Sequence, residues 1–434
     1  MKSFAELSVK GFRAIRSADI ELGGITVVAG VNGSGKSTLS KLLYYVFRNA
    51  NSFEELVLEH VNRQLRPYVN ILEQIRTVLW SNGARFTASA LPMFLRRLEL
   101  SSLDESKSFM DLSKKLCDRL IELEDRPQKT KGHIQNNRLK AIIASTLNTD
   151  DSKDIRESLD ILNHRIEECF HEADKLMAER PYRFLKNSLN SVFDSDLSRK
   201  VIVKEFGEPI FGEGLVSVPL PHYFRKVAYM DTPMVVGMDM SAEQPLHWRE
   251  LNALLKLPPK RGYKWSISNI IKKEIINGDV SYDDDLYSSG FKYSRDDGEE
   301  FSLAECATGI KSFAVLHLLL KNQFMDENTL MIIDEPEAHL HPQWIIEYAR
   351  VLVLLHKRLG VKFFIASHST DMVSALRYLS EKERCLSDVN FYVAESSRQN
   401  SFVFRSLEQD IEPIFESFNK SFERLDYYVD KKEA

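Results

Sequence analysis

The sequence has little of several features that would narrow its class. Among 434 residues there are four cysteines, which are far apart and form no Cys-x-x-Cys pair: Cys117, Cys169, Cys306 and Cys385. This spacing argues against a disulfide framework or a zinc site and favours a reducing compartment. No apolar run approaches the length of a membrane span, and Met1 to Lys10 lack the apolar core of a signal peptide. We therefore expect a cytoplasmic protein with no membrane partner.

An excess of charge of one sign is also missing. The chain carries 63 acidic and 58 basic side chains, a formal net charge of −5. Such a balance creates no global field that would attract nucleic acid or anionic lipid, so any contact with nucleic acid must be local. With 43% hydrophobic residues over this length, the chain is expected to form two to three globular domains.

Glycine nearly disappears between Ser52 and Asn190, where long charged residues alternate with Leu and Ile at helical spacing. This pattern predicts a helical insertion at 51–195 that divides an α/β head into 1–50 and 196–395, followed by a strand and an amphipathic helix in 396–434. A run with the spacing of a coiled-coil seam or helical hairpin consists of Ile155, Leu159, Leu162, Ile166, Cys169, Ala173 and Leu176. A second apolar face consists of Leu112, Leu116, Leu120 and Leu123.

Basic residues gather between these two helical patterns. The stretch Arg126–His133 is followed by Arg138 and Lys140, and no acidic residue occurs between Asp125 and Lys140. It is typical of a helical hairpin tip. Such a tip is either a solvated turn or a contact for nucleic acid or a partner protein, and the first is the commoner case.

The most informative stretch reads Gly-x-x-x-x-Gly-Lys-Ser and directly follows the β-branched run Ile25–Val28. Strand, glycine-rich loop and helix in this order are typical of a phosphate-binding loop, in which backbone N–H groups converge on phosphate oxygens. Lys36 adds a charge for the β and γ phosphates, and Ser37 offers Mg²⁺ a hydroxyl. The predicted nucleotide-binding residues are Gly30, Asn32, Gly33, Ser34, Gly35, Lys36, Ser37 and Thr38.

Two carboxylates follow a second apolar run, Leu330–Ile333. A buried strand that ends in Asp334 and Glu335 is the Walker B pattern, because paired acids at a strand end are costly unless they serve a cation or a reaction. Asp334 is expected to hold Mg²⁺, and Glu335 to act as the general base that polarises the attacking water. The sequence thus predicts ATP and Mg²⁺ as cofactors.

Two further stretches resemble known families. Lys10–Ile15 is similar to the "GFR" opening of ABC-type ATPases of the SMC, RecF and OLD kind, and Pro336–Pro342 resembles the "DEPExHLHP" segment of OLD-like ATPases. His339 and His341 with Glu337 could also suggest a metal site, but no further ligand cluster accompanies them. Within this class the chain resembles ATPases of bacterial anti-phage defence, the AriA component of PARIS and PtuA of Septu and retron systems.

The resemblance implies two more functional elements. Thr308, Gly309 and Lys311 match the signature motif, which binds the γ-phosphate held by the opposite protomer, although Thr308 stands where the family has serine. His368 matches the switch histidine that contacts the γ-phosphate. Without the resemblance, these residues would be a capped amphipathic helix and a core histidine.

The resemblance also implies a function. Two heads would sandwich ATP in a homo-oligomer, and hydrolysis would gate a separate effector such as a TOPRIM or HNH nuclease, because too few residues follow His368 for a fused nuclease domain. A RecF- or SMC-like ATPase acting on DNA in repair is the alternative, and an ATP-binding scaffold without activity is a weaker one. The tail places apolar residues on one helical face that either packs on the head or forms an interface: Ile411, Phe415, Phe418, Phe422 and Leu425.

Overall fold

A computed structural model of the protein describes residues 3–82, 100–125, 133–148, 154–238, 240–260, 265–285, 288–338, 340–397 and 400–418. Arg126–Gly132, which make up most of the predicted basic turn, lie outside this set, as do His339, Phe422 and Leu425. The chain divides into two compact units, one formed by Met1–Asn51 with Leu189–Ala434 and the other by Ser52–Ser188.

The first unit is built on a ten-stranded sheet among the described residues, in the order β5-β4-β1-β2-β13-β12-β3-β11-β10-β6. Its strands are β1 (Ala5–Phe12), β2 (Ile15–Leu22), β3 (Ile25–Ala29), β4 (Val201–Glu205), β5 (Glu208–Phe211), β6 (Lys226–Met230), β10 (Thr329–Asp334), β11 (Lys362–Ser367), β12 (Val389–Ser396) and β13 (Phe402–Glu408). β12, β3, β11, β10 and β6 are parallel to one another. The predicted α/β class is confirmed.

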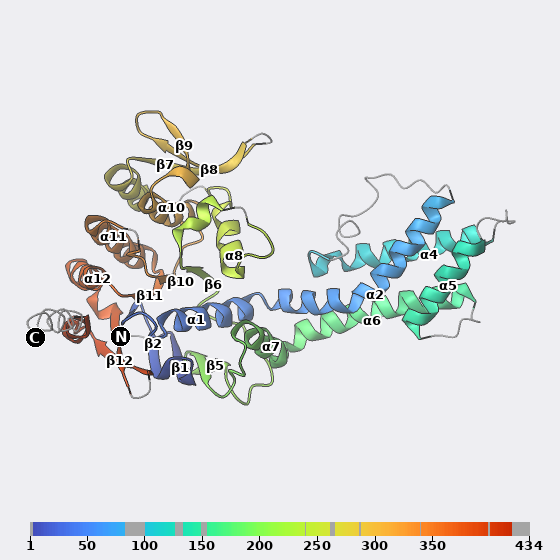
Figure 1. Ribbon diagram of the computed structural model, residues 1–434, viewed down its shortest axis with the longest axis horizontal. Coiled ribbons are helices and arrows are strands. Elements are labelled where there is room, and N and C mark those ends of the chain that lie inside the picture. Colours follow the sequence, from blue (N-terminus) through green and yellow to red (C-terminus); the bar gives the residue numbers. More distant parts are fainter. Residues whose placement is uncertain are drawn as a thin grey trace, which may run out of the picture. The chain divides into compact units, whose positions relative to one another are not determined.

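Helices cover both faces of the parallel strands (Figure 1). They are α1 (Lys36–Asn51), α8 (Leu246–Leu255), α9 (Trp265–Asn269), α10 (Thr308–Lys321), α11 (Pro342–Leu359) and α12 (Thr370–Lys382), with a π-helix at Ile270–Ile275 and 3₁₀ turns at Pro233–Gly237, Leu303–Glu305 and Leu386–Asp388. α1 packs on β6, β10 and β11, whereas α10, α11 and α12 share a core with alternate residues of β3, β10 and β11. Because both faces are covered, the strands are apolar throughout rather than alternating.

Two smaller features complete this unit. A three-stranded sheet is formed by β7 (Gly278–Asp285), β8 (Ser288–Arg295) and β9 (Glu300–Ser302). The described part of the tail packs on its own head, since Ile414 is fully buried and Phe415 and Phe418 lie against the same core as α11 and α12. These residues of the tail therefore show self-packing.

The second unit contains the helices α2 (Phe53–Ser81), α4 (Ser106–Glu124), α5 (His133–Leu147) and α6 (Ile155–Glu179), a 3₁₀ turn at Leu103–Glu105 and the first part of α7 (Tyr182–Phe193). All seven residues of the predicted seam on α6 are buried, and α6 packs against α2, α4 and α5. The seam is therefore internal to this unit. On α4 the buried face is displaced from the predicted one, because Phe109, Ser113 and Cys117 are buried with Leu116 and Leu120 while Leu112 and Leu123 are only half-buried.

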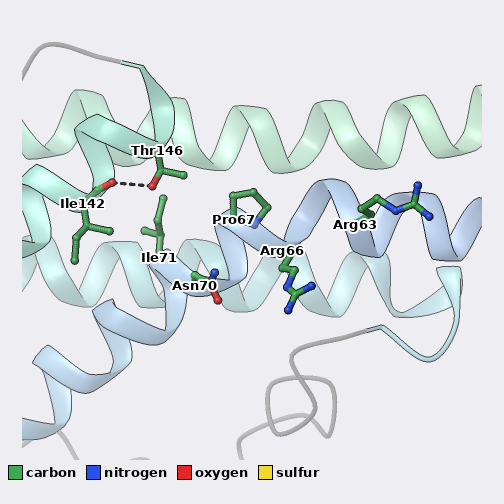
Figure 2. Close-up of a pocket in the computed structure, with 7 residues that line it drawn as sticks. All are labelled: Arg63, Arg66, Pro67, Asn70, Ile71, Ile142 and Thr146. Atoms are coloured by element: carbon green, nitrogen blue, oxygen red, sulfur yellow. Dashed lines mark hydrogen bonds between the residues drawn. The ribbon is translucent and has the colours of Figure 1, made fainter. Parts of the chain in front are cut away.

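Pro67 lies in the middle of α2 and shapes a pocket in this unit. Proline has no N–H for the carbonyl one turn earlier, and α2 bends there (Figure 2). The pocket has a volume of about 420 Å³ and an apolar floor of Pro67 and Ile71 with Ile142 of α5, while Arg63 and Arg66 stand at its rim. Neither arginine belongs to any motif found in the sequence.

Candidate nucleotide-binding site

The predicted site residues follow parallel strands that end at one edge of the sheet. Ser367 pairs with Ala29, Ala366 with Asp334, and Met230 with Ile333, so β3, β11, β10 and β6 end side by side. The carboxyl edge of a parallel sheet is where α/β proteins bind ligands. The glycine-rich loop, Asp334 with Glu335, and His368 are thus brought together there.

The loop between β3 and α1 requires glycine at defined positions. A Cβ on Gly30 would lie 2.6 Å from the Cβ of Ala394, and one on Gly35 would lie 2.7 Å from Ile15 Cγ1. Gly33 has a φ of +81°, a conformation that residues with a Cβ rarely adopt. Nothing lies within 4 Å of the position that a Cβ would take, so the backbone of the loop is open there. Among the described groups the buried Ser34 hydroxyl has no hydrogen-bond partner. An unsatisfied donor in a glycine-lined loop fits an anionic ligand.

Lys36 opens α1 and is 5% exposed. Its ammonium donates to the carbonyl oxygens of Gly30, at 2.8 Å, and Val31, at 3.0 Å. Burial lowers the pKa of Lys36, and the carboxylates of Glu335, Asp334 and Glu337 oppose that shift. The loop lysine and the acids after β10 therefore share one electrostatic environment.

Asp334 is 6% exposed and is held by hydroxyl groups. Ser40 donates to its Oδ1, Tyr229 donates to its Oδ2 at 2.8 Å, and Ser37 is a further hydrogen-bond partner. Burial raises the pKa of this carboxyl, although the three hydroxyls act against it. Sequence reasoning missed Ser40, which lies one helical turn beyond Lys36 on α1, and Tyr229, which only the alignment of β6 beside β10 brings near.

Glu335 follows Asp334 with a φ of +48°, in the left-handed region, and its N–H donates to the carbonyl of Ala366 at 2.8 Å. This backbone conformation is uncommon for a residue with a side chain. The Glu335 carboxylate is 41% exposed and lies 3.5 Å from Nδ1 of His368. The predicted pair of base and switch histidine is therefore adjacent.

The segment after Glu335 contains Glu337, His339 and His341, the possible metal ligands of the sequence. Within the described ranges, no group of three or more His, Cys, Asp and Glu side chains is arranged to hold a metal ion by itself. His341 caps α11, with Nδ1 accepting from the N–H of Gln343. Glu337 turns inward and binds Ser367 and His368.

Asp231 directly follows β6, at the same edge of the sheet as Asp334. Its carboxylate accepts from Nε2 of His247 at 2.9 Å and from the indole N–H of Trp248 at 2.6 Å, both of α8. Burial raises the pKa of Asp231, but these two hydrogen bonds outweigh it and hold the pKa below its ordinary value. Asp231 is also close enough to Asp334 to raise the pKa of that carboxyl.

The predicted signature residues begin α10. Gly309 is buried, and a Cβ there would lie 2.4 Å from a ring carbon of Trp344 in α11. Lys311 is 4% exposed, and its ammonium donates to the carbonyl of Ala304 at 2.7 Å. Thr308 is half-buried at the first position of the helix. Across the described part of the chain, no hydrogen bond links these residues to the phosphate loop.

A parallel sheet with a glycine-rich loop, an acidic strand end and a histidine after the neighbouring strand is the arrangement of a P-loop ATPase domain. No described helix combines the length and apolar character that crossing a bilayer needs. The family described as "AAA domain, putative AbiEii toxin, Type IV TA system" matches residues 25–374, and the chain belongs to this family.

Other comparisons are more distant. No curated protein matches the chain. Solved structures similar to it include the Smc head domain of Pyrococcus furiosus bound to the C-terminal domain of ScpA, at 12% identity and a TM-score of 0.35, covering 99% of this chain and 100% of that one. The SMC head domain of Thermotoga maritima is 12% identical with a TM-score of 0.35, covering 94% and 99%. An ATP-binding cassette of an ABC transporter in its ADP conformation is 12% identical with a TM-score of 0.34, covering 96% and 99%.

Proposed function

We propose that this chain binds and hydrolyses ATP between two heads. The observation that carries the proposal is the convergence of Lys36, Asp334, Glu335 and His368 at the carboxyl edge of the sheet. Backbone N–H groups of the loop bind the phosphates, and the Lys36 ammonium moves from its loop carbonyls to the β and γ phosphates. Glu335 polarises the attacking water, and His368 contacts the γ-phosphate.

Mg²⁺ would be held by Ser37 and Asp334. These residues supply a hydroxyl and a carboxylate that already lie within hydrogen-bond contact, and a hard cation prefers oxygen ligands. When bound, the ion neutralises charge on the β and γ phosphates. Ser40 and Tyr229 orient the Asp334 carboxylate and favour its ionised form, since both donate to it.

The second half of each site comes from the opposite head. The N–H groups at the start of α10 favour an anion, and the signature residues Thr308, Gly309 and Lys311 would bind the γ-phosphate held by the opposite head. Within the chain itself, the absence of a side chain at Gly309 lets α10 pack on Trp344, and the Lys311 ammonium donates to the carbonyl of Ala304. Like Lys36, Lys311 would leave its carbonyl partner to meet a phosphate.

The cycle serves as sensor and gate for a separate effector in anti-phage defence. The family description, which names a toxin of a toxin–antitoxin system, supports a link to a toxic outcome. A nucleotide-driven change can reach an effector only through contacts that differ in affinity between the two states. A RecF- or SMC-like role on DNA is the second candidate, and it predicts stoichiometric DNA binding at low salt.

Replacing Glu335 by glutamine tests the ATPase assignment. Glu335→Gln keeps the shape of the site but removes the base, so we expect normal ATP binding, loss of phosphate release and a larger, ATP-dependent oligomer by light scattering. Glu347→Gln, which neutralises a glutamate paired with Arg350 on the surface of α11, should hydrolyse ATP normally. Hydrolysis by Glu335→Gln at the wild-type rate would assign the base to another residue.

The effector role has its own test. The purified chain should degrade neither DNA nor RNA, and it should capture a neighbouring gene product in pull-downs that differ with and without ATP. Nuclease activity of the chain alone, abolished by Glu335→Gln, would contradict a separate effector. So would a chain that binds no neighbouring product in either nucleotide state.

A further inference from the structure

Glu337 is a buried acid that the proposed mechanism does not use. It lies two residues beyond Glu335, and its side chain is 5% exposed, whereas the side chains of Glu335 and His368 are 41% and 40% exposed. It is nevertheless part of the site, since its carboxylate is one of the three that oppose the lowering of the Lys36 pKa by burial.

One oxygen of Glu337 holds the segment that carries the switch histidine. Oε1 accepts from the hydroxyl of Ser367 at 2.9 Å and from the backbone N–H of His368 at 2.7 Å. The same oxygen lies 3.2 Å from Nδ1 of the His368 ring. One carboxylate oxygen from another loop therefore holds the main chain of His368 and also lies beside its ring.

This geometry selects the protonation pattern of the imidazole. Nδ1 lies 3.2 Å from one carboxylate and 3.5 Å from the other, and a nitrogen lone pair facing two anions would be repelled. The two carboxylates therefore favour a proton on Nδ1 over a lone pair. Nε2 is left as the ring nitrogen that can meet another group.

The second oxygen of Glu337 shows that the side chain is more than a structural acceptor. Oε2 is buried and has no hydrogen-bond partner among the described residues. Burying a carboxylate oxygen without a partner opposes folding, and such exceptions are found where a charge serves the reaction. Glutamine would fill the same volume without the charge.

We propose that Glu337 is the positioning residue for His368, holding the ring by its Nδ1–H so that Nε2 faces the γ-phosphate, and compensating the charge of the imidazolium when Nε2 donates to that phosphate. This inference rests on the proposed ATPase function. Glu337 contacts no reacting atom in this scheme and acts only through His368.

A double-mutant cycle on hydrolysis tests this dependence. Glu337→Gln should lower kcat about tenfold, in the range observed when a group that orients a functional histidine is removed, with KM for ATP changed less than twofold. His368→Ala should lower kcat at least as much. In the His368→Ala background, Glu337→Gln should cause almost no further loss, because the residue through which it acts is gone.

Histidine spectroscopy provides a readout that a merely structural role would not move. In protein labelled with ¹⁵N-histidine, the His368 resonance, identified by its loss in His368→Ala, should report a protonated Nδ1 in the wild type. Glu337→Gln should shift this signal toward the Nε2–H tautomer, and Glu347→Gln should leave it unchanged. Because the amide keeps the volume of the acid, Glu337→Gln should melt within a few degrees of the wild type.

The outcomes separate the inference from the function on which it rests. Wild-type kcat in Glu337→Gln, equal losses with and without His368, or an Nδ1 that is unprotonated in the wild type would each overturn the positioning role. A wild-type chain that does not hydrolyse ATP would instead overturn the proposed function. If Glu337→Gln fails to fold, the Nδ1 signal of the wild type still decides.

Discussion

Asp334→Asn should make the nucleotide-free protein more stable while removing its response to nucleotide. Burial raises the pKa of Asp334 above its unfolded value, so the ionised carboxylate opposes folding at neutral pH, and that penalty disappears only as the pH falls through the folded pKa. Asparagine carries no charge. The hydroxyls of Ser40 and Tyr229 can both donate and accept, so they can rotate to pair with the amide.

The expected gain is roughly 0.5–2 kcal/mol, which is the usual size of a stabilising change at a functional site. Each kcal/mol corresponds to about 2–4 °C in Tm. With Mg²⁺ and ATP at a hundred times Kd, the wild type should gain about 2.7 kcal/mol by binding, and the variant, without its carboxylate ligand, should gain little. The order of stability should therefore reverse between the two conditions.

Thermal melting with and without Mg²⁺ and ATP measures both effects. Asp326→Asn is the matched control, because burial raises the pKa of Asp326 but the hydrogen bonds from Lys226 and its other partners hold it below the ordinary value. Its ionised form therefore stabilises the fold, and this variant should melt at a lower temperature than the wild type but keep the nucleotide shift. An Asp334→Asn protein that melts below the wild type without nucleotide would refute the reasoning, as would one that keeps the full nucleotide shift.

Three further predictions concern α10 and the pairing of heads. Gly309→Ala should lower the denaturant midpoint by an amount equivalent to about 1–3 kcal/mol, because its Cβ would lie 2.4 Å from an indole carbon and this clash outweighs the ~1 kcal/mol by which alanine favours a helix over glycine. Gly290→Ala, whose Cβ would meet nothing within 4 Å, should not lower the midpoint. Equal midpoints for the two variants would contradict the packing argument. Mixing Lys36→Ala protein with Thr308→Asp protein, each expected to be inactive alone, should restore part of the ATPase activity. In a mixed dimer, one of the two composite sites contains neither change. Mixed dimers that form without any recovery of activity would exclude sites shared between heads. Burial lowers the pKa of His317 to about 3, so as the pH falls the unfolded chain takes up a proton on this histidine before the folded chain does. The free energy of unfolding should therefore decrease as the pH falls from about 6.5 to 3, by up to about 1.4 kcal/mol per pH unit more steeply than in His317→Gln. Denaturant unfolding measured over this pH range checks the difference.

The sequence by itself determined the elements whose chemistry is local. The phosphate loop and the acidic strand end are read from spacing alone, because a glycine-rich turn or a carboxylate after an apolar strand needs only its immediate neighbours to be recognised. The helical character of the insertion and the buried seam from Ile155 to Leu176 follow from periodicity in the same way. The order of these motifs predicts the α/β class that the sheet shows.

Only the tertiary structure decided which distant residues meet. Glu337 is 31 residues from His368, and Asp231 is 16 from His247; parallel strand ends and the packing of α8 bring each pair together, and no spacing rule encodes this. The hydrogen bond from the Lys311 ammonium to the carbonyl of Ala304 is likewise invisible in the sequence. Periodicity tells that a face is buried but not what covers it, because side chains of many sequences can fill the same space.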